Sequence, residues 1–151
     1  MYVKKENLIF ISIIFIILII IGGVYLKMKY DEREKQKEIY YKEQQERIIL
    51  YLKYNTKEPN TIKVIHFTKY GTTPMGSTTI EGYINNQTKN TFSALNSPEN
   101  NYQFQGDMTL SQELYNLLKP AHERKSPDEI KKELDKKKLV YTRFKKTKLR
   151  G

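Results

Sequence analysis

The stretch LIFISIIFIILIIIGGVYL, residues 8–26, holds nineteen residues without a charge, and nine of them are isoleucine. As a helix rising about 1.5 Å per residue it would be roughly 28 Å long, close to the ~30 Å hydrocarbon core of a bilayer. Tyrosines stand near both ends, where the polar interfaces of a membrane would lie: Tyr2, Tyr25 and Tyr30. The stretch therefore predicts a single membrane-spanning helix that anchors the chain in the cell membrane.

A cleaved signal peptide is the alternative interpretation of the same stretch. Lys4 and Lys5 would form its basic start, but Ile21-Gly22-Gly23 places a small residue at only one of the two positions that cleavage requires. We therefore expect a retained signal anchor, and cleavage remains the alternative. An N-terminal lipid anchor would require a cysteine, and the chain has none.

The charges that flank this stretch give opposing indications about orientation. Two lysines precede it, whereas six basic residues follow it closely: Lys27, Lys29, Arg33, Lys35, Lys37 and Lys42. Basic flanks favour the cytoplasmic side, but that rule loses force when a long segment follows, because domains translocate largely regardless of charge. We expect the following domain on the extracytoplasmic face, with the cytoplasmic face as the alternative.

The net charge of +10 is concentrated at the C-terminal end of the chain. Residues 1–26 carry +1, residues 27–54 carry +2, residues 55–118 carry −1 and residues 119–151 carry +8. A nucleic-acid-binding domain is expected to spread basic residues over its folded surface. The nearly neutral middle of the chain therefore argues against nucleic acid as a partner.

Few side chains suited to catalysis or to metal binding are present. The chain has no cysteine, and its two histidines, His66 and His122, stand far apart without a second ligand at metal-site spacing. It also lacks a glycine-rich phosphate loop and a nucleophile motif. We therefore expect no enzymatic activity, no cofactor and no metal site. An uncharacterised hydrolase is the alternative, and its acids would come from Glu81, Glu99 and Asp107.

The residues after the anchor predict one α+β domain. A polar stalk helix (27–38) leads into a helix with an apolar face that includes Tyr41, Ile48, Ile49 and Leu52. Four strands follow, at residues 61–68, 77–84, 90–95 and 102–108, separated by turn residues. Ser111 and Ser126 then begin two short helices. We expect one helix packed on a four-stranded antiparallel sheet, with a cystatin-like outline and short C-terminal helices.

Five regions result from this division. They are a basic flank (1–7), a transmembrane signal anchor (8–26), the polar stalk (27–38), the α+β domain (39–135) and a basic tail (136–151).

The part after the anchor carries a series of distinctive motifs: RIILYLKYN (47–55), PMG (74–76), EGYINN (81–86), NYQFQGD (101–107), LLKP (117–120) and SPDEI (126–130). Over roughly residues 25–135 the chain resembles a staphylococcal family of proteins of unknown function, DUF1433. The resemblance implies a small exported domain behind a membrane or lipid anchor in Gram-positive bacteria, with no established activity. The tail after Lys138 lies outside the shared pattern.

These features favour a membrane-anchored, extracytoplasmic binding protein with a protein partner. One role that such a protein could have is immunity against a secreted toxin. Candidate contact residues are Tyr70, Pro74, Met75, Tyr102 and Phe104. Aromatic residues that alternate along a strand usually belong to the core, so the Pro74-Met75-Gly76 loop is the better candidate.

The basic tail offers a second function. Its lysines and arginine could bind anionic lipid, a wall polymer or nucleic acid: Lys136, Lys137, Lys138, Lys145, Lys146, Lys148 and Arg150. Val140, Tyr141 and Phe144 lie among these charges and could insert into an interface. A solvated terminus without a binding role is the alternative interpretation.

Overall fold

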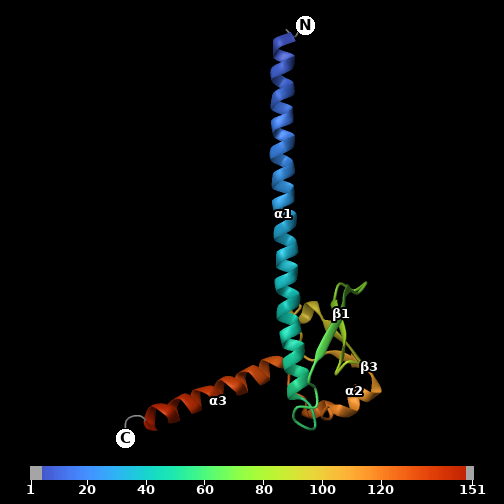
Figure 1. The fold of residues 1–151 in the computed structure, drawn as a ribbon, viewed down its shortest axis with the longest axis vertical. Coiled ribbons are helices and arrows are strands. Elements are labelled where there is room, and N and C mark those ends of the chain that lie inside the picture. The colour runs from blue at the N-terminus through green and yellow to red at the C-terminus, as the bar shows by residue number, and fades with distance from the viewer. Residues whose placement is uncertain (1–4, 149–151) are drawn as a thin grey trace. The chain divides into compact units, whose positions relative to one another are not determined.

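The computed structural model describes residues 5–148, and within this range it leaves out the side chains of residue 6 and of residues 142–148. The chain forms two units, Met1–Lys42 and Glu43–Gly151. Helix α1 (Lys5–Tyr54) contains all of the described part of the first unit and extends into the second (Figure 1).

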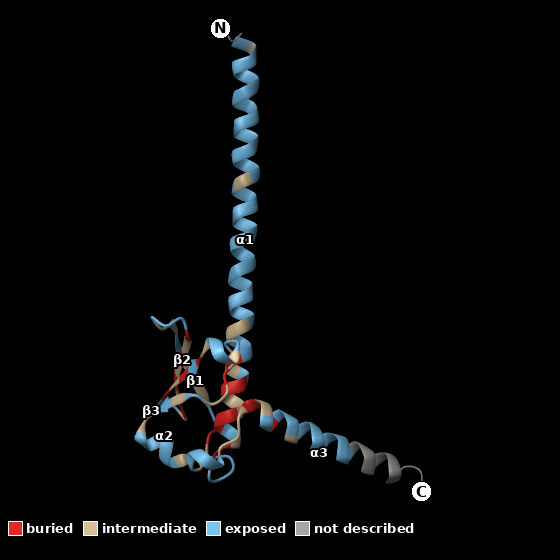
Figure 2. Cartoon of the chain, turned by 180° about the vertical axis from the view of Figure 1, so that it is seen from behind, coloured by how far each residue is buried: buried red, intermediate tan, exposed pale blue. Residues whose placement is uncertain are grey.

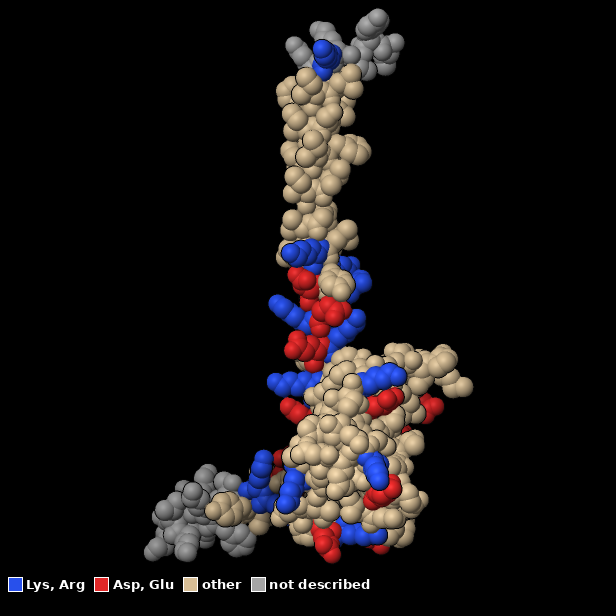
Figure 3. Space-filling view, turned by 45° about the vertical axis from the view of Figure 1, so that its right-hand side comes forward, with Lys and Arg blue, Asp and Glu red and all other residues tan. Residues whose placement is uncertain are grey.

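Helix α1 carries the predicted apolar stretch. Among the described residues it is the one helix long and apolar enough to cross a membrane, judged by length and composition. Figure 3 shows its apolar part free of charged side chains, with basic and acidic residues beginning beyond it. The structure therefore agrees with a membrane helix near the N-terminus.

The second unit is built on an antiparallel meander of four strands in the order β1-β2-β3-β4. The strands are β1 (Ile65–Thr72), β2 (Thr78–Ile84), β3 (Gln87–Asn96) and β4 (Met108–Leu110). Asn85 and Asn86 both have positive φ angles, of 53° and 55°, and form the two-residue turn between β2 and β3. This order confirms the predicted α+β fold.

One face of the sheet forms the core together with the end of α1. Ile80, Ile84, Phe92 and Ala94 alternate with more exposed residues along β2 and β3, and all four are buried. Buried side chains from the helices and loops complete the core: Ile48, Tyr51, Leu52, Ile62, Phe104, Leu114, Leu118 and Ile130. Figure 2 shows buried residues, in red, toward the end of α1. The predicted apolar helix face is confirmed at Ile48 and Leu52, which have no exposed surface.

The first and the fourth strand differ most from the sequence-based prediction. The first strand begins at Ile65 rather than at residue 61, because the preceding segment is bound by the side chain of Asn85. That side chain accepts hydrogen bonds from the Lys63 and Val64 amides and donates one to the Thr61 carbonyl.

The fourth strand is the second difference. It covers only Met108–Leu110 instead of residues 102–108. Asn101, Tyr102 and Gly106 have positive φ angles, of 51°, 59° and 120°, which an extended strand cannot contain. Residues 102–107 are therefore a loop that returns the chain to the sheet.

Two α-helices of the second unit begin where the sequence predicted, and one of them is longer than predicted. Ser111 caps α2 (Gln112–Leu117) by accepting a hydrogen bond from the Leu114 amide. Ser126 and Glu129 form a reciprocal cap at the start of α3 (Pro127–Lys148). Helix α3 is 22 residues long and continues through residues 136–148, which the sequence suggested as a separate tail. The 3₁₀ turns are η1 (Pro98–Asn100) and η2 (Ala121–Glu123).

Candidate functional site

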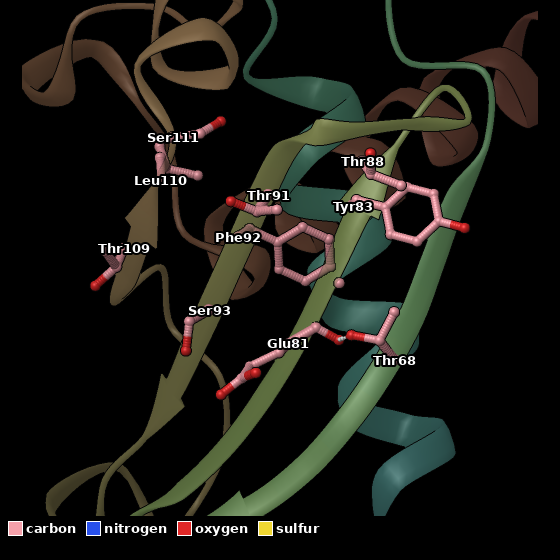
Figure 4. A pocket seen from close by; sticks show the side chains of 11 residues that line it. Thr68, Glu81, Tyr83, Thr88, Thr91, Phe92, Ser93, Thr109, Leu110 and Ser111 are labelled. Carbon is pink, nitrogen blue, oxygen red and sulfur yellow. Dashed lines mark hydrogen bonds between the residues drawn. The ribbon is translucent and has the colours of Figure 1, made fainter.

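The face of the sheet opposite the core carries a shallow hollow of about 630 Å³. Because side chains alternate along a strand, the partners of the buried residues on β2 and β3 point to this second face. The residues that line it are Thr68, Glu81, Gly82, Tyr83, Thr88, Thr91, Phe92, Ser93, Thr109, Leu110 and Ser111 (Figure 4). Glu81, Tyr83, Thr91 and Ser93 belong to this face, whereas Gly82 and Phe92 are buried residues that alternate with them along β2 and β3. We call this feature the sheet hollow.

Hydroxyl groups dominate the chemistry of the sheet hollow. Thr91 and Ser93 on β3, with Thr109 on β4, supply a row of them, and Glu81 is the single carboxylate among the lining residues. A hydroxyl can both donate and accept a hydrogen bond, whereas a carboxylate only accepts. The sheet hollow therefore suits an uncharged ligand surface rich in hydrogen-bonding groups.

Tyr83 forms an aromatic wall of the sheet hollow. His66 on β1 lies opposite it in the register, and the two rings stack with their centroids 4.8 Å apart and their planes 23° apart. The His66 ring is held in turn by a hydrogen-bonding contact between Nε2 and Oδ1 of Asn86. This support restricts the orientation of the Tyr83 ring. Less side-chain entropy would therefore be lost when the ring contacts a ligand.

A β-bulge shapes the edge of the sheet hollow next to β1. The register shifts between Phe67 and Lys69, so Thr68 is an extra residue opposite β2. The Thr68 hydroxyl donates to the Glu81 carbonyl at 3.3 Å (Figure 4). The bulge thereby adds one more hydroxyl-bearing side chain to the lining.

A largely buried polar cluster of Gln44, Arg47 and Asp128 holds the loop of residues 103–105 and the start of α3 against α1. The Arg47 Nε donates to the Phe104 carbonyl at 2.9 Å, and its Nη1 lies 2.9 Å from Oδ1 of Asp128. Gln44 accepts a hydrogen bond from the Phe104 amide at 2.8 Å. Although Arg47 is charged, its side chain is only 6% exposed. The polar partners that allow this burial lie far along the chain, so the sequence around Arg47 does not reveal it.

Loss of this cluster is expected to weaken the domain. Replacing Arg47 by Ala leaves the buried Phe104 carbonyl without its donor and Asp128 without its cation, and it also removes buried side-chain packing. We expect a loss of about 2–3 kcal/mol in the free energy of unfolding, below the value for a fully buried ion pair because Asp128 is 46% exposed. Urea unfolding of a soluble fragment, residues 39–151, measures this loss.

Asp128→Asn is the matched control for that variant. Hydrogen bonds from Gln105 and then from Arg47 lower the pKa of Asp128 below its ordinary value. The stabilisation from the ionised carboxylate is therefore present above the unfolded-state pKa and is lost as the pH falls through the folded-state pKa. We expect Asp128→Asn to cost less than Arg47→Ala at neutral pH and to reduce the loss of stability in acid. Equal costs for the two variants would contradict a main role for the Phe104 hydrogen bond and packing.

The predicted contact residues do not form one site. Met75 is 91% exposed at the tip of the turn between β1 and β2, next to exposed Pro74, while Tyr70 and Tyr102 are exposed on other elements. Phe104 is fully buried and packs edge-on against Tyr51, with ring centroids 5.4 Å apart. Phe104 is therefore a core residue, and its proposed surface contact role is withdrawn.

The predicted anionic-surface residues are only partly described. Lys136, Lys137 and Lys138 are exposed on α3. The side chains of Lys145, Lys146 and Lys148 are not described, and Arg150 lies outside the described residues.

The side chains considered for catalysis are also dispersed. Glu81 lines the sheet hollow, whereas Glu99, Asp107, His66 and His122 do not. Within the described part of the chain, no group of three or more His, Cys, Asp or Glu residues is placed to hold a metal ion.

Apart from Glu81, the residues of the sheet hollow were not singled out from the sequence. In the sequence, Thr79, Glu81 and Tyr83 alternate with Ile80 and Ile84, and this alternation is the local signal for the face that they occupy. The sequence signal that could have found the hollow is the matching alternation of Thr91 and Ser93 with Phe92 and Ala94 on the next strand.

Comparison with known families supports the resemblance seen in the motifs. The model of a family described as "Protein of unknown function (DUF1433)" matches residues 40–132. The chain belongs to the DUF1433 family. Every residue that lines the sheet hollow lies within the DUF1433 match, whereas the apolar stretch and the last part of α3 lie outside it.

One solved structure similar to this DUF1433 chain is the folded 79-residue fragment of Lin0334 from Listeria innocua, determined by solution NMR. The two share 31% sequence identity, the match covers 60% of this chain and 90% of that chain, and the TM-score is 0.48. No curated protein matches this DUF1433 chain.

Proposed function

We propose that this DUF1433 protein is a membrane-tethered, non-enzymatic binding protein that holds a partner protein on the open face of its sheet. The observation that carries the proposal is the sheet hollow, because helix α1 and the core occupy one sheet face and the other bears a concave surface of about 630 Å³. Concave surfaces with an aromatic side chain and several hydrogen-bonding groups are common binding sites.

The chemistry of the sheet hollow supports binding rather than a reaction. General acid–base catalysis needs a second titratable group within hydrogen-bond reach of the substrate, with its pKa set apart from that of the first. Glu81 has no second carboxylate or histidine beside it in the lining. Threonine and serine hydroxyls without an adjacent base are weak nucleophiles but good hydrogen-bonding partners.

The proposed location is the outer face of the cell membrane, with the apolar part of α1 as the anchor. One candidate partner class is a secreted protein toxin that the domain would neutralise close to the membrane. Such a role needs only a folded domain, a tether and a surface for the partner.

Site-specific photo-crosslinking in living cells tests the sheet hollow. A photoreactive phenylalanine analogue replaces Thr91, an exposed residue of the lining, and in a matched variant it replaces exposed Glu99 on η1, outside the hollow. We expect crosslinked protein adducts from position 91 and none of the same mass from position 99. Equal adducts at both positions, or none at position 91, would contradict the proposed binding face.

Cysteine labelling tests on which side of the membrane the domain lies. The chain has no native cysteine, so an introduced cysteine is the single site of labelling. Lys89, an exposed residue at the start of β3, is replaced by Cys. A membrane-impermeant thiol reagent should label this variant in intact cells, with the protein recovered in the membrane fraction. Labelling only after lysis would place the domain inside the cell and refute the surface role.

A further inference from the structure

Helix α3 has a buried beginning and an exposed continuation. Pro127 and Ile130 are buried, and Glu133 binds both the Tyr54 hydroxyl and the Lys125 ammonium group. Every residue at positions 134–141 is exposed. The buried part of α3 therefore lies in its first two turns, and the side chains at positions 134–141 are accessible to another surface.

This exposed part of α3 carries large apolar side chains beside its charges. Leu139 is 65% exposed, Val140 is 52% exposed and Tyr141 is 71% exposed. Three large apolar side chains exposed within one helical turn are a candidate interaction surface. Together with Lys136, Lys137 and Lys138, all exposed, they interleave apolar and basic side chains around this part of α3.

The charge of this end of the chain is of one sign. Residues 136–151 include eight lysines and arginines and no aspartate or glutamate. Glu133 and Asp135 lie within one helical turn before Lys136, Lys137 and Lys138, but no acidic residue follows these lysines. The net positive charge of this segment therefore indicates, by charge complementarity, an anionic partner.

An anionic lipid surface fits this combination of basic and exposed apolar side chains better than nucleic acid or a folded protein does. Nucleic-acid binding relies on the phosphate charges, and exposed Leu139 and Val140 have no role there. A helix with lysines and with aliphatic and aromatic residues, by contrast, is typical of segments that lie in the interface of an anionic membrane. The chain also carries a helix long and apolar enough to span a bilayer, so a lipid surface is available to it.

We propose that α3, from Leu134 onward, binds an anionic membrane surface. Leu139, Val140 and Tyr141 enter the interfacial region, and Lys136, Lys137 and Lys138 lie among the lipid phosphates. Binding is independent of the sheet hollow, so it does not require the partner suggested above. It is also independent of which side of the membrane the domain occupies, provided that the leaflet is anionic.

The test uses the full chain reconstituted into vesicles. Val140 is replaced by Cys and labelled with an environment-sensitive fluorophore, and a Lys89→Cys variant serves as the control position. We expect the label at position 140 to shift to shorter wavelength and to be quenched by lipid-borne quenchers in vesicles that contain phosphatidylglycerol. It should do neither in pure phosphatidylcholine, and high salt should weaken both changes. The label at position 89 should respond in neither membrane.

A pair of charge variants makes the test specific. Lys136, Lys137 and Lys138 are changed together to Gln, and the matched control changes the exposed residues Lys57, Lys63 and Lys89 to Gln, so that both variants lose the same charge. Quenching at position 140 should fall to the phosphatidylcholine value in the first variant and stay unchanged in the second. Equal losses in both, or equal quenching in the two lipids, would overturn the proposal.

A soluble polyanion provides the last comparison. Polyphosphate is added to the chain in phosphatidylcholine vesicles. A spectral change at position 140 equal to that caused by phosphatidylglycerol, without lipid-borne quenching in either membrane, would assign α3 to an anionic polymer and overturn the lipid surface.

Discussion

Replacing Ile48 by Asp is expected to unfold the α+β domain. Ile48 has no exposed surface and lies in the core formed by the end of α1 and the sheet. The variant loses a buried apolar side chain and buries an unpaired carboxylate, and together these should cost at least about 5 kcal/mol. That loss is comparable to the whole stability of a small domain, which is about 5–15 kcal/mol.

Circular dichroism and urea unfolding of the soluble fragment of residues 39–151 measure the effect. The wild-type fragment should show one cooperative transition, and the Ile48→Asp fragment should show none. Ile39→Asp, at a position 60% exposed, is the matched control and should retain the transition. A cooperatively folded Ile48→Asp fragment would show that α1 does not pack against the sheet.

Replacing Gly82 by Ala is expected to have the second largest effect. Gly82 lies in the middle of β2, where an added methyl carbon would stand 2.2 Å from the His66 carbonyl oxygen and 2.6 Å from the Phe92 ring. The first contact is with backbone, which cannot rotate away. The β1 bulge and the Phe92 ring would both have to move, at a cost of about 3 kcal/mol.

Gly71→Ala is the control within the same pair of strands. Its added carbon would meet only the Thr79 hydroxyl, at 2.8 Å, and that side chain can rotate. Thermal unfolding of the two variants should therefore show a large decrease in Tm for Gly82→Ala and a small one for Gly71→Ala. Similar decreases would mean that the close contacts at Gly82 are relieved by small movements.

The elements that the sequence predicted well are those with local signals. The Asn85-Asn86 turn, the alternation along β2 and the Ser126 cap each depend on residues close together in the chain. The apolar stretch of α1 belongs with them, since length and composition alone reveal it. Local backbone preferences and short-range periodicity therefore account for most of the architecture.

The features that the sequence did not predict depend on contacts between distant residues. Arg47 is buried because Asp128 and the Phe104 carbonyl meet it, and the segment before β1 is kept out of the sheet by the Asn85 side chain. The sheet hollow combines residues from all four strands and the loop after β4, so its lining follows only once the strand order is known. The pairing of Arg47 with Asp128 and Phe104, and that of Asn85 with the segment before β1, have no signature in the nearby sequence.

The bulge at Thr68 has a consequence for many copies of the protein in one membrane. Strand β1 is at the edge of the sheet, and a regular edge strand is a template on which a second copy can add its own. Anchoring confines copies to a plane and raises their effective concentration, which would favour such joining. The displaced residue and the neighbouring charge of Lys69 interrupt this edge, which disfavours joining of copies through β1.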